Sequence, residues 1–249
     1  MELTLMKTSN PAFLGTPYAI GGYGPAMTIS GTVNKAGILM LCVLATAAWS
    51  WNQFLTNGPA SVGGYTIIGA FGGFIVAMIT VFKKEWSPVT APVYALLEGL
   101  FLGSLSAMME VRFPGIAIQS VALTFGTCFC LLLAYRSGMI RATQKFTYGI
   151  VAATGGIALV YFVSIILGLF HVQVPGIFGS GPVGILFSLG VVVIAALNLI
   201  LDFSMIEEGA ARGAPKYMEW YSAFGLMVTL VWLYLEIIRL LSKLRDNRR

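Results

Sequence analysis

The chain has 249 residues, of which 57% are hydrophobic and only 10% are charged, and its formal net charge is +5. Charged residues make up about a quarter of an ordinary soluble domain, so this composition excludes that class together with collagen-like, disordered and disulfide-rich chains. Most Lys and Arg residues fall in short gaps between apolar runs and form no basic patch, so no nucleic-acid partner is expected. The composition is that of a membrane protein, whose first partner is the lipid bilayer.

Apolar runs long enough to cross a bilayer follow one another along the chain. A spanning helix needs about 20 apolar residues, and Pro, Gly and charged residues separate seven such runs. The predicted fold class is therefore all-α, a polytopic bundle of seven transmembrane helices. The predicted spans are 36–54, 62–82, 88–109, 115–135, 147–170, 183–206 and 218–241.

The segments outside these spans are short. Residues 1–35 contain many Gly, Pro, Ser and Thr residues and predict a flexible or interfacial N-terminal arm. Residues 36–242 form the predicted seven-helix domain, and residues 243–249 form a basic C-terminal tail. No soluble stretch is long enough to hold a second core.

The Lys and Arg residues predict an orientation with the N-terminus in the cytoplasm, because basic loops stay on that side of a membrane. With this orientation nine basic residues lie inside and six outside. Seven spans place the C-terminus outside, and the basic residues near it conflict with the positive-inside rule. The last hairpin is then either a full crossing with an unusual outer end or a re-entrant segment. Five of the six outer basic residues cluster there: Arg239, Lys243, Arg245, Arg248 and Arg249.

Two pairs of glycines, Gly69 with Gly73 and Gly99 with Gly103, have the Gly-xxx-Gly spacing. This spacing lets helix backbones approach closely in lipid, so it predicts tight helix packing in the second and third spans.

Enzyme motifs are missing from the sequence. The chain has one histidine, and it contains neither a nucleophile elbow, nor a phosphate-binding Gly-rich loop, nor a pair of axial histidines for haem. We therefore expect no enzymatic activity, no catalytic residues and no bound cofactor, with Ca²⁺ as a transient ion at most.

Three carboxylates lie within the predicted spans, where each charged group costs roughly 3 kcal/mol or more. Glu98 is near the middle of the third span, Asp202 near the inner end of the sixth and Glu236 toward the outer end of the seventh. Together they predict a ladder of oxygen ligands through the bilayer, which suits cations or protons. Lys83 and Lys84, at the inner end of the second span, are candidate partners that would pair with Asp202 and close an inner gate.

Each carboxylate also has a structural explanation. A neutral Glu98 hydrogen-bonded to a neighbouring backbone needs no transport role. Glu236 has Arg239 three residues later, the spacing of a local ion pair. Asp202 has Asn198 one turn earlier on the same face, which favours a polar stripe, but it is also compatible with an ordinary helix end that faces water.

Three stretches of the chain resemble the Bax inhibitor family and its bacterial YccA-like members. They are LDFSMIEEG at 201–209, PVYALLEGLFLG at 92–103 and WLYLEIIRLL at 232–241. The resemblance covers about residues 35–245 and agrees with the seven spans. It implies a membrane protein that acts as a pH-sensitive Ca²⁺ leak or, in bacterial relatives, as a modulator of a membrane-bound AAA protease.

The resemblance also assigns residues. Asp202 matches the family's aspartate on the sixth helix, whereas the family's second aspartate has two candidate positions. Matching the LYLE segment puts Glu236 there, and matching Ala223 and Arg239 puts Thr229 there. Depth favours Thr229, because Glu236 and Asp202 would lie nearly a membrane thickness apart in antiparallel helices. A C-terminus on the inner side would bring Glu236 back to Asp202.

The sequence thus leads to two hypotheses for function. The first is a pH-sensitive cation leak in the cytoplasmic membrane of a bacterium. The second is a non-conducting modulator of a membrane protease or another membrane protein. The sequence fixes no oligomeric state. The ion-pathway or pH-sensing residues of the first hypothesis are Asp202, Glu98, Glu236, Asn198 and Thr229.

Overall fold

The computed structural model of the protein describes residues 25–170 and 176–248. Seven long helices in this part of the chain are each long and apolar enough to cross a membrane, which confirms the predicted all-α, seven-span fold. Two single-turn 3₁₀ helices, η2 (Pro59–Ser61) and η3 (Lys84–Trp86), lie on either side of the second helix. The long helices are α1 (Ile29–Asn57), α2 (Gly63–Phe82), α3 (Ser87–Arg112), α4 (Ile116–Arg136), α5 (Gln144–Leu169), α6 (Pro182–Ala211) and α7 (Met218–Asp246).

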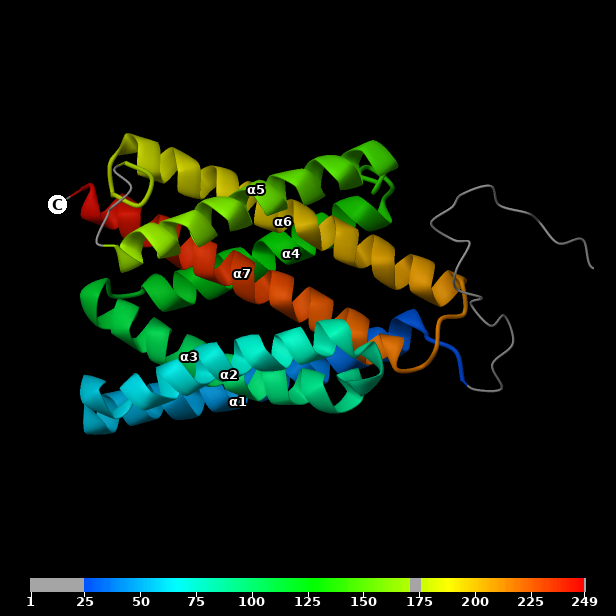
Figure 1. Ribbon diagram of the computed structural model, residues 1–249, viewed down its shortest axis with the longest axis horizontal. Coiled ribbons are helices and arrows are strands. Elements are labelled where there is room, and N and C mark those ends of the chain that lie inside the picture. The colour runs from blue at the N-terminus through cyan, green and yellow to red at the C-terminus, as the bar shows by residue number, and fades with distance from the viewer. Residues whose placement is uncertain (1–24, 171–175, 249) are drawn as a thin grey trace, which may run out of the picture.

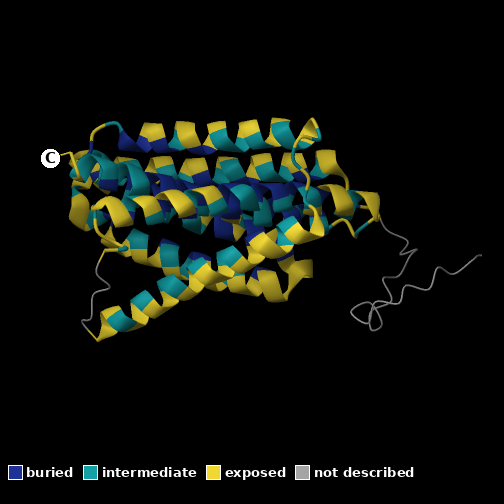
Figure 2. Ribbon diagram, turned by 90° about the horizontal axis from the view of Figure 1, so that it is seen from above, coloured by how far each residue is buried: buried dark blue, intermediate teal, exposed yellow. Residues whose placement is uncertain are grey.

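Helix α7 is the centre of the bundle. It crosses diagonally between α1–α3 and α4–α6 (Figure 1), and it packs against α1, α3, α4 and α6. One cluster of buried side chains joins α7 to α1 and α3, and a second joins α7 to α6. Exposed residues, most of them apolar along the spans, cover the outer faces of the other helices (Figure 2). This is the burial expected where lipid surrounds the bundle.

Helices α1, α2 and α3 pack closely through the predicted glycines. A Cβ atom on Gly69 of α2 would lie 2.7 Å from the carbonyl oxygen of Leu97 on α3. Gly99 and Gly103 of α3 lie even closer to the backbone of α1, where a Cβ atom would clash with carbonyl oxygens. The Gly-xxx-Gly pairs therefore serve helix packing, as predicted.

The first and last helices extend beyond their predicted bounds. Helix α1 begins at Ile29, where the Thr28 side chain accepts a hydrogen bond of 3.0 Å from the Gly31 N–H and caps the helix. Helix α7 continues to Asp246 and includes most of the predicted basic tail. Residues 1–24 of the predicted arm lie outside the described residues.

The two ends of the bundle are distinct. Helix α7 runs along the whole bundle, so its last turn and the first turn of α1 lie at opposite ends (Figure 1). We call the end with the first turn of α1 the N-terminal end and the end with the last turn of α7 the C-terminal end. The last span is a continuous helix, and this favours a full crossing over a re-entrant segment.

Candidate functional site

Asp202 lies in the interface between α6 and α7. Its Oδ2 atom is buried and has no hydrogen-bond partner among the described residues. The side-chain hydroxyl of Thr229, on α7, interacts with the Asp202 carboxyl group. Gly225, one turn before Thr229, faces the carboxyl, and a Cβ atom there would lie 3.9 Å from Oδ1, an ordinary contact distance. The thiol of Cys128, on α4, is a titratable group close to Asp202.

Asp202 lies more than two helical turns before the end of α6. Helix α6 continues for nine residues beyond it, to Ala211, so the carboxyl lies about 14 Å from that end of the helix at 1.5 Å per residue. Thr229, eleven residues into α7, lies at about 17 Å. Asp202 is therefore about a third of the way along α6 from the N-terminal end of the bundle, and the apolar run of this helix ends four residues beyond it, at Ile206.

Glu98 lies at a similar depth on α3. It is eleven residues after Ser87, or about 17 Å along the helix. The Tyr94 hydroxyl, one turn earlier, interacts with its carboxyl group. Gly73 of α2 makes room for it, since a Cβ atom there would lie 3.0 Å from the Glu98 Oε1 atom. In place of the expected ladder of three depths, Asp202 and Glu98 lie at similar depth and Glu236 lies toward the C-terminal end.

The structure does not bring Lys83 and Lys84 to Asp202. Both lysines follow the end of α2, which packs on α3, and the Lys84 ammonium lies 5.2 Å from the centre of the Tyr221 ring. Because Asp202 is more than two helical turns inside the bundle, a lysine at the end of α2 cannot serve as its counter-ion. Among the described residues no ion pair joins Asp202 to a basic group.

Asn198 connects α6 to α5. Its side-chain amide donates to the Thr154 hydroxyl, at 2.9 Å, and to the Ile194 carbonyl oxygen, at 2.9 Å. Its amide protons are therefore used between two helices, and Asp202, one turn later, faces Thr229 instead.

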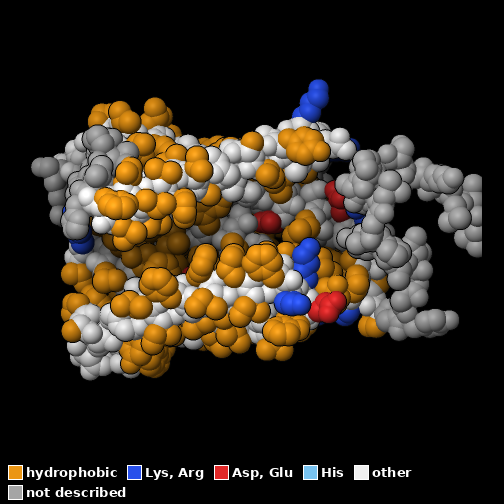
Figure 3. All heavy atoms as spheres, in the orientation of Figure 1, with side chains coloured by type: hydrophobic (Ala, Val, Ile, Leu, Met, Phe, Trp, Pro, Cys, Tyr) orange, Lys and Arg blue, Asp and Glu red, His pale blue; other side chains and the backbone are white. Residues whose placement is uncertain are grey.

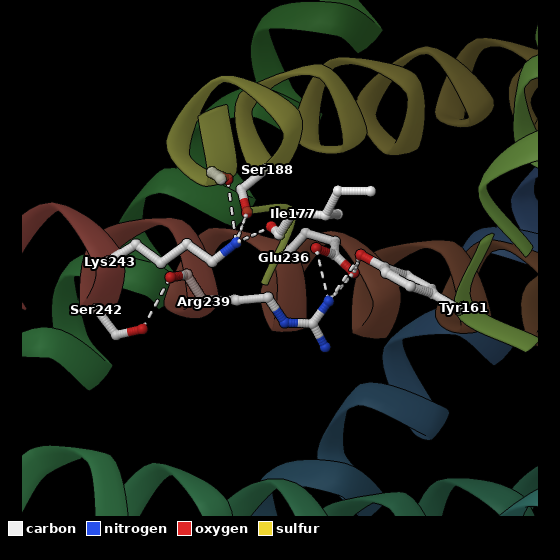
Figure 4. A network of polar contacts seen from close by, with 8 residues as sticks. Tyr161, Ile177, Ser188, Glu236, Arg239, Ser242 and Lys243 are labelled. Carbon is white, nitrogen blue, oxygen red and sulfur yellow. Dashed lines mark hydrogen bonds and ion pairs between the residues drawn. The ribbon is translucent and has the colours of Figure 1, made fainter. Parts of the chain in front are cut away.

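Glu236 belongs to a separate network near the C-terminal end (Figure 4). It is only 2% exposed, and its Oε1 atom accepts hydrogen bonds from the Tyr161 hydroxyl, at 2.9 Å, and from Arg239, at 3.0 Å. Arg239 also donates to the Tyr161 oxygen, at 2.7 Å. The local ion pair with Arg239 is present, as its spacing predicts, and it joins α7 to α5.

Lys243 extends this network and was missed by the sequence analysis. Its buried ammonium group donates to the Ile177 and Gly184 carbonyl oxygens, each at 3.0 Å, and to the Ser188 hydroxyl, at 2.9 Å (Figure 4). It therefore ties the last turns of α7 to the start of α6 and the residues before it. A basic residue in an apparent tail gives no sequence signal for such burial.

The position across from Asp202 is occupied by Thr229 and not by Glu236. Glu236 is eighteen residues into α7, about 27 Å from its start, whereas the Asp202 carboxyl faces the helix near residue 229. The prediction from depth thus agrees with the structure, and Asp202 has no second carboxylate opposite it on α7.

A fourth carboxylate, Glu219, lies buried at the N-terminal end and was also missed. Its Oε1 atom accepts from the Thr28 N–H, at 2.9 Å, from the Thr28 hydroxyl, at 2.8 Å, and from Lys216, at 2.7 Å. Lys35 of α1 lies 2.7 Å from Oε2. Glu219 thus holds the start of α1 against the start of α7, with two lysines to balance its charge.

Two kinds of carboxylate emerge. Glu219 and Glu236 are fixed by basic partners at the two ends of the bundle. Asp202 and Glu98 lie at similar depth inside the bundle, with hydroxyl groups as their polar neighbours. Figure 3 shows the protein surface hollowed between the two halves of the bundle, with acidic atoms at the floor of the hollow.

Comparison with known proteins gives one match. A family model described as Bax inhibitor 1 like matches residues 6–246, nearly the whole chain. No curated protein and no solved structure matches this chain.

Proposed function

The chain belongs to the Bax inhibitor 1-like family of integral membrane proteins, and from this premise we propose that it is a pH-sensitive, passive leak for cations, with Ca²⁺ as the transported ion. Asp202 is the pH-sensitive element in this proposal. Glu98 keeps the path attractive to cations, because a carboxylate at similar depth favours positive over negative ions.

The observation that carries the proposal is the buried, unpartnered oxygen of Asp202. Leaving a buried polar atom without a hydrogen bond costs about 1–3 kcal/mol, so such an atom asks for a reason. The carboxylates at the two ends have basic partners, and Asp202 has none among the described residues. An intramembrane carboxyl group of this kind is a candidate for proton or ion handling.

Protonation of Asp202 supplies the gate. An ionised carboxylate accepts a stronger hydrogen bond from a hydroxyl group than a neutral carboxyl does. Thr229 is poised to donate, because its present bond to the Gly225 carbonyl oxygen is long, at 3.3 Å. Ionised Asp202 therefore holds α6 against α7, and protonation weakens this contact. The leak should rise as pH falls.

Ca²⁺ would pass the site and not remain there. Calcium sites hold the ion with six to eight oxygen ligands. Within residues 25–170 and 176–248, no three His, Cys, Asp or Glu side chains gather as a metal-binding group. Single carboxylates at Asp202 and Glu98 suit brief contact with an ion in transit.

We also propose that the N-terminal end faces the cytoplasm of a bacterial cell, with the protein in the inner membrane. The loops at that end carry most of the basic residues that have no ion-pair partner among the described residues, as the positive-inside rule requires. At the opposite end Arg239 pairs with Glu236, Lys243 is buried, and Arg245 donates to the Pro114 carbonyl oxygen at 2.7 Å. These bonds within the protein reduce the effect of the basic C-terminus on orientation.

Orientation is tested by cysteine labelling. A variant without Cys42, Cys128 and Cys130 receives one new cysteine, at exposed Met139 or at Arg248. Seven crossings require that a membrane-impermeant thiol reagent reach these two positions from opposite sides. Labelling of both from one side would refute the topology.

The leak itself is tested in liposomes that contain a Ca²⁺ dye and the purified protein. We expect Ca²⁺ entry that increases from pH 8 to pH 5, and a lower entry rate in Glu98→Gln. Folded protein without Ca²⁺ flux anywhere in this range would contradict the leak. That result would favour the second hypothesis, a non-conducting modulator of a membrane-bound AAA protease or another membrane protein.

A further inference from the structure

A cavity lies on the side of α7 where α1, α3 and α4 meet it. Its volume is about 480 Å³, within the range of pockets that hold small molecules. Apolar side chains form most of its wall, among them Met40 and Leu44 of α1, Val121 of α4, and Met227 and Leu230 of α7. Neither Asp202 nor Glu98 is part of this wall, so the cavity is separate from the proposed leak.

The polar groups on the wall already have partners. The Ser106 and Tyr234 hydroxyls bond each other at 2.6 Å, and Thr124 donates to the Ser120 carbonyl oxygen at 2.7 Å. The Glu110 carboxylate accepts from backbone N–H groups at the start of α4. A buried water needs two to four polar partners, so these walls favour an apolar occupant over water.

The cavity opens between α1 and α4. These two helices form no packed interface with each other in the described chain, although both line the cavity. Leu44, Ile118 and Phe125 line the cavity and are also exposed on the outside of the bundle, Ile118 by 68%. In a bilayer this opening faces the lipid chains.

The length of the cavity matches one leaflet. On α1 the lining runs from Met40 to Trp51, eleven residues or about 17 Å. Met40 is near mid-depth and Trp51 near the C-terminal end. Half of a hydrocarbon core of about 30 Å is about 15 Å, so the cavity spans one leaflet from its middle to its interface. Trp51 lies at the depth where aromatic residues meet lipid headgroups.

From this geometry we propose that the cavity is a binding site for one acyl chain of a bilayer lipid. The chain enters sideways between α1 and α4 and contacts α7, and its headgroup stays at the interface near Trp51 and Glu110. A bound acyl chain would stabilise the bundle, because helix packing in membranes depends on van der Waals contacts, and an empty cavity of this size would lack them.

The test uses the full-length protein in phosphatidylcholine vesicles that contain a phospholipid with a diazirine in the middle of one acyl chain. After irradiation, mass spectrometry locates the adducts. We expect adducts at Met227 and Leu230, which are 2% and 8% exposed, and at Phe129, which is 60% exposed on the outside of α4. Lipids that only surround the bundle reach Phe129 but not the two residues of α7.

A matched pair of variants provides the control. Ala48 lines the cavity, whereas Ala45, on the same helix, is exposed and lies outside its wall. Ala48→Phe should reduce the α7 adducts about tenfold, because the added ring takes space that the chain needs, while Ala45→Phe leaves them unchanged. Both variants should melt at the wild-type temperature and keep the Phe129 adduct.

Two results would overturn the site. One is labelling of Phe129 without labelling of Met227 or Leu230 in the wild type, which would show that lipid does not enter. The other is equal labelling of α7 in Ala48→Phe and Ala45→Phe, which would show that the chain reaches α7 by another route. Neither result bears on Ca²⁺ flux, so this proposal and the leak fail separately.

Discussion

Asp202 and Glu236 show two ways in which a seven-helix bundle accommodates a carboxylate. Glu236 has an arginine and a tyrosine within hydrogen-bond distance, and Lys243 is buried about two turns further along the same helix. Asp202 has a buried oxygen without a partner and only Thr229 across the interface. A carboxylate with a full set of partners is part of the architecture, whereas one that lacks them is free to change its protonation or its contacts. The comparison predicts that substitutions at the C-terminal end reduce stability and that substitutions at Asp202 or Thr229 change the leak.

The largest loss of stability is expected for Lys243→Ala. This change leaves two carbonyl oxygens and the Ser188 hydroxyl without their buried donor, so the free energy of unfolding should fall by about 3 kcal/mol. Unfolding in detergent micelles measures the change. Arg248→Ala, at an exposed position beyond the helix, is the control and should be neutral. A neutral Lys243→Ala would mean that the ammonium group does not hold these segments together.

A smaller loss is expected for Glu236→Gln. The amide keeps an acceptor for Tyr161 but removes the charge that pairs with Arg239. Because the Arg239 side chain is 41% exposed and screened by solvent, the loss should be about 1 kcal/mol. The same unfolding assay applies, and the Ca²⁺ flux and its pH dependence should stay at wild-type values. A changed pH profile would move the pH sensor to this network.

Thr229→Val sharpens the comparison at Asp202. Valine has the shape of threonine but cannot donate to Asp202, so the contact between α6 and α7 should weaken by about 1 kcal/mol or less. Flux at pH 8 should then rise toward the level that the wild type reaches at pH 5. Thr229→Ser, which keeps the hydroxyl group, should behave like the wild type. If valine and serine give the same flux, the hydroxyl group is not part of the gate.

The smallest effect on stability is expected for Asp202→Asn. The substitution preserves the shape and removes an uncompensated charge from the membrane interior, so the free energy of unfolding should change by less than about 0.5 kcal/mol or increase. A loss as large as that of Lys243→Ala would contradict the distinction between the two regions, because it would show that Asp202 also has a structural role.

The sequence predicted the features that depend on local pattern. Apolar runs located all seven helices, and the three-residue spacing of Glu236 and Arg239 predicted their ion pair. The end of α6 was predicted too early, because the helix continues past its apolar run through Glu207 and Glu208 to Ala211, and hydropathy does not register a helix that extends into the polar interface. The expected pairing of Asp202 with Lys83 or Lys84 assumed a helix end close to Asp202.

Other features depend on which helices contact one another and therefore could not be predicted from the sequence. Lys243 finds its three acceptors on residues more than fifty positions earlier, and Glu219 meets Thr28 from the other end of the chain. The lipid-facing cavity requires four helices and a gap between two of them. No periodic pattern within one helix predicts such contacts between helices.

Ca²⁺ entry into liposomes, measured from pH 5 to pH 8 for the wild type and for Asp202→Asn in parallel, tests most directly whether Asp202 makes the leak pH-sensitive. We expect that wild-type flux rises as the pH falls, and that the variant has the flux of the acidic wild type at every pH, because its side chain is always neutral. An Asp202→Asn profile that still follows the wild-type pH dependence would contradict the assignment of Asp202 as the pH-sensitive element.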